Sequence, residues 1–286
     1  EIIHASKFSI FFIDESQRVT LKDIGSVEEI QKYIGQADAE SEIMELESQF
    51  RCNGSDGYIA WLDDVLDIRK TANKDGFDLD YDVKICDTPN EVRDIIFEKN
   101  KINNKARLLA GYCWDWIKEG KNKSDVFDIT IPEYNFAMSW NLGNSQTWAI
   151  DPNSVNEIGC IHTAQGLEFD YVGVIIGNDL KYENNEIVTD VTERAKTDQS
   201  IKGIYKMFQQ DFDQAEKIAD EIIKNTYRTL MTRGQKGCYI YCVDKKLSNY
   251  LKKRLNKKDE IIYSTYEEEN KDNMMIAEDS EEYKYE

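Results

Sequence analysis

Two carboxylates and an amide follow an apolar run near the start of the chain, in the sequence DESQ at residues 14–17. The preceding residues, 8–13, read FSIFFI, and a continuous apolar core of this kind is typical of a strand buried on both faces of a parallel sheet. Such a strand would place Asp14 and Glu15 at the carboxyl edge of the sheet, where α/β proteins bind ligands. For nucleotide hydrolysis the first carboxylate would hold Mg²⁺, the second would accept a proton from the attacking water, and Gln17 would sense the γ-phosphate. A strand that ends in charged residues to leave the core is the alternative.

Two arginines end amphipathic segments elsewhere in the chain. Arg51 lies in LESQFRC at residues 46–52, and Arg233 lies in YRTLMTRG at residues 227–234. Phosphoryl transfer places negative charge on equatorial oxygens, and a guanidinium group binds such oxygens through two parallel hydrogen bonds. Taken alone, either arginine is more simply explained as a surface residue.

A polar stretch, IHTAQGLEFD at residues 161–170, precedes the apolar run YVGVIIG. It contains His162, which is one of only two histidines in the chain. Gly166 allows a close approach of the backbone, and the small side chains of Thr163 and Ala164 leave room for a phosphate. We expect a strand, a loop and a strand at the carboxyl edge of a sheet, and a tight turn between two core strands is the alternative.

Taken in order, these four stretches resemble the motifs of superfamily-one helicases. DESQR is similar to motif II (Walker B), LESQFRC to motif IV, HTAQGLEFD to motif V and YRTLMTRG to motif VI. The resemblance is closest to a bacterial branch of DNA/RNA helicase-like domains of unknown function, which is related to the ATPase part of Schlafen proteins. The WDW sequence at residues 114–116 is also similar to that branch. The resemblance covers residues 8 to about 245.

The resemblance implies ATP and Mg²⁺ as cofactors, and single-stranded DNA or RNA as the partner of the parent protein. The catalytic residues that it implies are Glu15 as the base, Gln17 as the residue that couples nucleotide state to movement, and Arg51 and Arg233 as arginine fingers. Asp14 would be the metal ligand, and Gly166 and Glu168 would lie at the phosphate–ribose edge of the nucleotide. His162 and Thr163 would contact the nucleic-acid backbone. We expect Glu15, Arg51, Gly166 and Arg233 to converge on one triphosphate pocket.

The family's phosphate-binding loop, GxxxxGK[ST], does not occur in this sequence, and Gly120-Lys121 lacks both the upstream glycine and the Ser or Thr. We therefore expect a fragment that lacks the Walker A half of its first motor domain and that hydrolyses little ATP by itself. The parent protein is expected to be an ATP hydrolase. Two alternatives stay open, namely a non-catalytic module that binds nucleic acid or protein, and a defence- or restriction-associated protein in which the helicase part accompanies a nuclease.

The elements that must position these residues alternate between strands and helices. Strands are predicted at residues 83–86, 106–112, 158–161, 172–176 and 238–243, and helices at 57–70, 89–99, 210–233 and 245–258. Thr88, Pro89 and Glu91 form a helix-start signal. The expected fold is α/β, a RecA-like parallel sheet flanked by helices (the helicase C-terminal motor domain of a P-loop NTPase), with a partial first motor domain. The predicted domains are residues 1–45, residues 46–262 with an insertion near 178–209, and an acidic tail at 263–286.

Composition limits the partners of the chain. The 286 residues include 36 basic and 55 acidic side chains, and the net charge of -19 argues against non-specific coating of nucleic acid but leaves room for a narrow basic groove. The tail is rich in acidic residues and expected to be mobile. Six cysteines without a CxxC pair indicate reduced core residues. We find no apolar run long enough for a membrane span and no signal peptide, and we expect a cytoplasmic protein.

Three further features have two interpretations each. Trp114, Trp116, Trp140 and Trp148 could stack on bases or could pack in the core. The basic helix at 245–258 could contact phosphates or could form a solvated face. The apolar strand at residues 8–13 could pair with another chain, which would give self-association, or this edge of the sheet could be disordered.

Overall fold

The chain forms a three-layer α/β fold around a seven-stranded sheet. The computed structural model describes residues 1–23, 25–44, 52, 55–71, 81–117, 123, 125–140 and 147–255. In sheet order the strands are β1 (Asp82–Ile85), β9 (Gly234–Cys242), β6 (Phe169–Ile176), β2 (Ala106–Ala110), β5 (Glu157–Gly159), β4 (Phe136–Trp140) and β3 (Ile129–Ile131). Neighbouring strands are parallel except β3, which is antiparallel to β4. The predicted α/β class with a mostly parallel sheet is confirmed.

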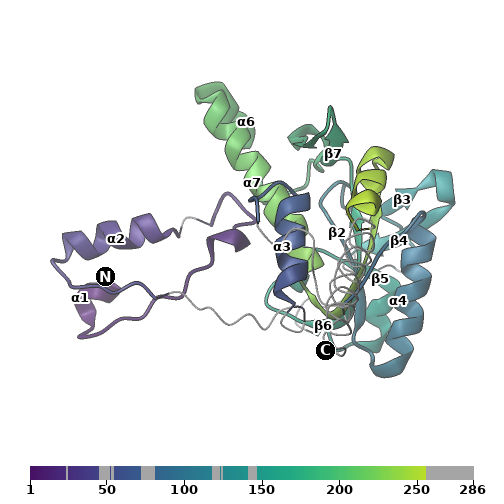
Figure 1. Cartoon of the computed structure of the whole chain (residues 1–286), viewed down its shortest axis with the longest axis horizontal. Coiled ribbons are helices and arrows are strands. Elements are labelled where there is room, and N and C mark those ends of the chain that lie inside the picture. Colours follow the sequence, from purple (N-terminus) through teal and green to yellow (C-terminus); the bar gives the residue numbers. More distant parts are fainter. Residues whose placement is uncertain are drawn as a thin grey trace, which may run out of the picture.

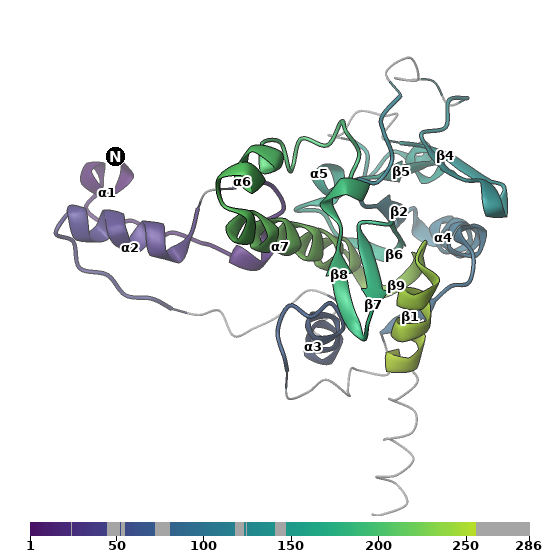
Figure 2. The ribbon, with the colours of Figure 1, turned by 90° about the horizontal axis from the view of Figure 1, so that it is seen from above.

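Helices cover both faces of this sheet (Figure 2). α3 (Asp56–Val65), α7 (Phe212–Met231) and a helix at residues 245–255 share one hydrophobic core, to which they contribute Trp61, Leu230 and Leu247. α4 (Pro89–Asn103) lies on the opposite face and contributes Val92 and Ile96 to a second core. The central strands β2 and β6 are buried on both faces, which explains their continuous apolar sequence.

The predicted start of α4 is confirmed. The hydroxyl of Thr88 accepts a hydrogen bond from the amide of Glu91 at 3.1 Å, and Pro89 occupies the first helical turn. The helix ends at Asn103, and the next residue, Asn104, caps it in a left-handed conformation with φ 58°. These local signals fix the position of α4 against β2 and β6.

The packing of α4 on β6 depends on Gly173. A Cβ atom at this position would lie 2.5 Å from Cγ1 of Val92 and 2.8 Å from Cγ1 of Ile96. We expect Gly173→Ala to lower the free energy of unfolding by about 1–3 kcal/mol, because the helix would have to move off the sheet. Urea denaturation measures this change. Gly35→Ala is the matched control, since nothing lies within 4 Å of a Cβ there; equal losses in the two variants would contradict the prediction.

The predicted buried strand at residues 8–13 is wrong. These residues form no strand, and the exposed fractions of Phe8 and Phe12 are 81% and 82%. They belong to the N-terminal arm (described residues 1–44), which leaves the body of the molecule and carries α1 (Ile2–Ala5), η1 (Glu15–Gln17) and α2 (Val27–Gln36) (Figure 1). A strand forms only where its backbone groups pair with a neighbouring strand, and the arm extends away from the sheet.

The segment predicted as an insertion has structure of its own. It contains a hairpin of β7 (Leu180–Glu183) and β8 (Glu186–Thr189), then η6 (Val191–Glu193) and α6 (Ile204–Gln210). The remaining short elements are η4 (Pro132–Tyr134), η5 (Pro152–Asn156) and α5 (Ile161–Ala164). No helix in the described ranges is long and apolar enough to cross a membrane.

The features with two interpretations are partly resolved. Trp140 and Trp148 are buried at 1% exposure each, whereas Trp116 is 38% exposed. In the helix at 245–255, Lys252 pairs with Asp87 and Arg254 pairs with Asp64, so part of its charge is used within the chain.

All six cysteines are free, and five of them are buried, as predicted for core residues. The acidic tail lies outside the described residues.

Candidate functional site

The ends of two predicted motifs meet at the amino ends of β6 and β9. Arg233 comes between α7 and β9 and is 4% exposed. Its guanidinium donates to the carbonyl of Thr229 at 3.0 Å and to that of Leu167 at 3.4 Å, while its own carbonyl accepts from the amide of Phe169 at 2.9 Å. Arg233 is therefore fixed against residues 166–169, the segment that contains Gly166 and Glu168.

Gly166 has open space on the side where a side chain would project. Its φ is 81°, in the left-handed region that favours glycine, and nothing lies within 4 Å of a Cβ built there. The neighbouring Glu168 is exposed. Gly166, Glu168 and Arg233 thus form one group, with a basic side chain, an acidic side chain and an accessible stretch of backbone.

The stretch at residues 161–170 differs from the expected strand, loop and strand at one sheet edge. β5 ends at Gly159, α5 follows directly, and β6 begins at Phe169. Because β5 and β6 both run parallel to β2, the chain must return from the carboxyl edge of the sheet to the amino edge between them. The stretch is a crossover, and its two ends lie at opposite edges of the sheet.

The first end of this crossover carries the predicted nucleic-acid residues. His162 is exposed, and its ring lies 5.9 Å from the ring of Tyr112, measured between centroids. Thr163 is only 7% exposed; its hydroxyl accepts from the amide of Cys160 at 2.8 Å and donates to the carbonyl of Cys160 at 2.9 Å. Thr163 therefore fixes the turn, and His162 is the residue of the two that presents its side chain to solvent.

The DESQ stretch closes into a short turn instead of ending a strand. The carboxylate of Asp14 accepts from the amide of Ser16 at 3.1 Å and from the side chain of Gln17 at 2.7 Å. The carboxylate of Glu15 accepts from the amide of Val27 at 3.1 Å, at the start of α2. Within the described residues no group of three His, Cys, Asp or Glu side chains could hold a metal ion.

Arg228 connects the N-terminal arm to the body, and no role was predicted for it from the sequence. It pairs with Asp63 of α3, and it donates to the hydroxyl of Ser16 at 3.1 Å. The side chains of Arg228 and Asp63 are 9% and 2% exposed. The sequence signal was a charged residue beside the apolar Tyr227, Leu230 and Met231, because a charge buried among such side chains needs a partner.

Arg51 lies outside the described residues. Its neighbour Cys52 is fully buried, and the Cys52 thiol contacts the carbonyl of Thr232 at 3.8 Å. The end of the LESQFRC stretch thus reaches the residue that precedes Arg233.

A buried charge network joins the insertion to the sheet. Arg194 pairs with Asp179 at 3.0 Å and with Asp198 at 2.7 Å, and all three side chains are fully buried. The hydroxyl of Tyr227 donates to Asp179 and accepts from the amide of Gly177. Burial by itself lowers the pKa of Arg194, but the two carboxylates raise that pKa overall, so the guanidinium stays charged. Burial also raises the pKa of Tyr227, which keeps its hydroxyl protonated.

Residues 1–244 match the family "Schlafen group 3, DNA/RNA helicase domain". The chain belongs to this family. An uncharacterized protein of Saccharomyces cerevisiae is 24% identical over 221 residues, which is 72% of this chain and 47% of that protein. The chain therefore spans about half the length of this relative. No solved structure matches the chain.

In this Schlafen-type helicase-like domain the predicted residues fall into three places. Gly166, Glu168 and Arg233 lie together at the amino edge of the sheet. His162 and Thr163 begin the crossover near the carboxyl edge. Asp14, Glu15 and Gln17 lie on the arm, and Arg51 is outside the described residues.

Proposed function

We propose that this chain is part of a nucleic-acid-dependent ATPase of superfamily-one type, which couples ATP hydrolysis to movement on DNA or RNA. In this proposal it comprises the second RecA-like motor domain and the end of the first. The observation that supports the proposal best is the 3.4 Å contact of Arg233 with the carbonyl of Leu167. This contact holds an arginine beside the open backbone at Gly166, which is the combination that a phosphate group needs.

On the nucleotide side, Arg233 and Arg51 would stabilise charge on the γ-phosphate, and Gly166 and Glu168 would line the phosphate–ribose edge. Asp14, Glu15 and Gln17 would act in metal binding, proton transfer and sensing. Because the carboxylates of Asp14 and Glu15 now accept hydrogen bonds within the arm, these bonds would have to open first. ATP with Mg²⁺ would also need a phosphate-binding loop, which this sequence does not contain.

On the nucleic-acid side, the exposed His162 would contact the backbone of a single strand. Thr163 would act by holding the turn at Cys160. The crossover between His162 and Glu168 would then connect the two sides, because it runs across one face of the sheet between them.

A fluorescent ATP analogue tests the nucleotide side. We expect Arg233→Lys to weaken its binding about tenfold or more, because lysine keeps the charge but loses the planar guanidinium. Arg93→Lys is the matched control, since Arg93 lies in α4 and pairs with its neighbour Asp94. Fluorescence titration measures both affinities, and thermal melting confirms folding. Equal affinities in the two folded variants would contradict the proposed role of Arg233.

A specific observation favours a second candidate, a non-catalytic module that binds nucleic acid or protein. The carboxylate of Glu15, the proposed base, accepts a hydrogen bond at the start of α2, as a structural residue would. Phosphate release by the full-length parent separates the two candidates. A motor requires release that single-stranded DNA or RNA stimulates and that Glu15→Gln abolishes, whereas a binding module predicts no such release.

A further inference from the structure

A cavity of about 460 Å³ lies between the insertion and the loop that follows β2. Residues 113 and 115 form one wall, and residues 192–205 form the other. The volume is in the range of pockets that hold small molecules or parts of larger ligands. The cavity is at the carboxyl edge of the sheet, whereas Gly166 and Arg233 are at the amino edge. It is therefore distinct from the proposed nucleotide site.

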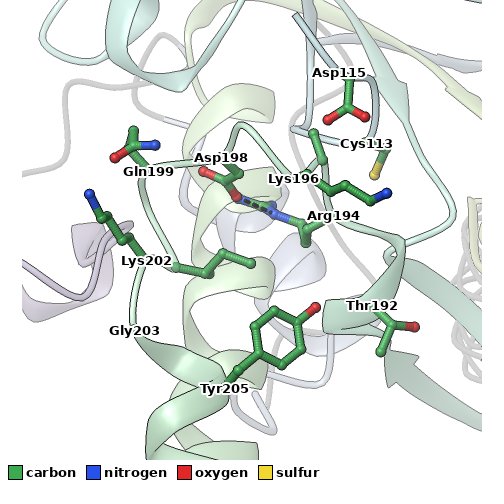
Figure 3. Close-up of a pocket in the computed structure, with 12 residues that line it drawn as sticks. Cys113, Asp115, Thr192, Arg194, Lys196, Asp198, Gln199, Lys202, Gly203 and Tyr205 are labelled. Carbon is green, nitrogen blue, oxygen red and sulfur yellow. Dashed lines mark hydrogen bonds and ion pairs between the residues drawn. The ribbon is translucent and has the colours of Figure 1, made fainter.

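The walls of this cavity carry two lysines that form no ion pair within the part of the chain that the structure describes. Lys196 and Lys202 line it, both are exposed, and neither forms an ion pair with the described residues. Figure 3 shows them on either side of the Arg194–Asp198 pair. Arg194 is shared between Asp198 and Asp179, and all three side chains are fully buried, so the lysines and Asp115 are the charged groups of the cavity that are exposed to an occupant. Two unpaired ammonium groups at a concave surface favour an anionic occupant in a chain of net charge -19.

Aromatic side chains lie along the same edge. Tyr205 lines the cavity and is 57% exposed. A second cavity, of about 200 Å³, shares Cys113 with the first and has Trp114 in its wall. Trp116 is 38% exposed, and its amide donates to the hydroxyl of Thr197 at 3.3 Å. Adjoining cavities with exposed rings suit an extended ligand with several planar groups.

The first cavity also adjoins the proposed nucleic-acid side. The amide of Ala195 donates to the carbonyl of Tyr112 at 2.8 Å, and the Tyr112 ring lies beside the ring of His162. The guanidinium of Arg194 lies 5.7 Å from the centre of the Tyr112 ring. Tyr112 thus lies between the insertion and the start of the crossover.

We propose that this cavity binds a single-stranded polynucleotide, with Lys196 and Lys202 on backbone phosphates and Tyr205 stacked on a base. The inference rests on the proposed function and extends its nucleic-acid side from His162 onto the insertion. A polynucleotide fits better than a free nucleotide, because the two cavities adjoin and the aromatic residues continue beyond the first cavity.

Fluorescence anisotropy with labelled oligothymidylate and oligouridylate, each about 20 nucleotides long, tests the inference on the full chain. We expect Lys196→Ala/Lys202→Ala to bind at least about tenfold more weakly at about 50 mM salt, and the slope of log affinity against log salt to fall by about 1.4, which corresponds to two lost phosphate contacts. Lys206→Ala/Lys217→Ala removes the same charge from α6 and α7 and should leave both quantities unchanged.

Tyr205→Ala should weaken binding about tenfold without a change in slope, and Tyr205→Phe should bind like the unmodified chain.

The possible failures can be told apart. If the unmodified chain binds neither oligonucleotide, both the inference and the nucleic-acid side of the proposed function are overturned. If it binds, and His162→Ala weakens binding while the cavity lysine variant does not, the inference alone is overturned. Displacement of the label by AMP at an equal phosphate concentration would also overturn it, because the cavity would then be a mononucleotide site. Comparison of the two oligonucleotides shows whether DNA or RNA is preferred.

Discussion

Arg194→Met is expected to lower the free energy of unfolding by about 3–5 kcal/mol, because it leaves two buried carboxylates without their cation. Asp179 and Asp198 are fully buried, and both depend on the same guanidinium. Methionine retains most of the side-chain volume, so the loss measures charge and hydrogen bonding more than packing. Urea denaturation gives the value.

The control for this prediction is Arg93→Met, which breaks an exposed pair with Asp94 and should cost less than about 1 kcal/mol. Asp198→Asn added to Arg194→Met should recover part of the loss, since it removes one of the stranded charges. A cost for Arg194→Met as small as that of the control would show that the insertion is not held by this network.

Most of the sheet could be predicted from the sequence because its signals are local. Val92 and Ile96 at helical spacing after Thr88 are sufficient to place α4, and the apolar run at residues 172–176 is sufficient to place β6. The run at residues 8–13 is also strongly apolar, but a strand needs a partner as well, and pairing is not a local property. The same limit applies to the crossover at residues 161–170, whose direction depends on how β5 and β6 are ordered in the sheet.

The candidate site was predictable in part. Arg233 and Gly166 stand out because an arginine can bind phosphate oxygens and a glycine allows a close approach of the backbone. The structure brings their segments together. Arg228 does not stand out, because its partner Asp63 is distant in sequence. Arg194 does not stand out, because its partner Asp179 lies in a polar segment. The sequence shows which residues could bind phosphate, but it does not show which charges are buried as pairs.

The second large effect concerns Arg228, at the junction of the arm, α3 and α7. Arg228→Met should lower the free energy of unfolding by about 3 kcal/mol, which is the low end of the range expected when one partner of a buried ion pair is removed. The loss should not be larger, because Asp63 keeps a second partner, the largely exposed Arg69, at 2.8 Å. The variant also removes the hydrogen bond to Ser16. The contact between the DESQ turn and α7 should therefore loosen, and amides of residues 14–21 should exchange with solvent faster.

Hydrogen exchange distinguishes this local release from general destabilisation. Arg18→Met breaks a weaker contact, the 3.5 Å pair of Arg18 with Glu221, and should cost less than about 1 kcal/mol. If Arg228 joins the arm to the body, its loss should speed exchange at residues 14–21 more than in β2 and β6, where exchange reports global unfolding. Equal acceleration everywhere would mean that Arg228 stabilises only the core. In that case the DESQ turn would have no special connection to α7, and the proposed role of Gln17 in coupling nucleotide state to movement would lose its structural basis.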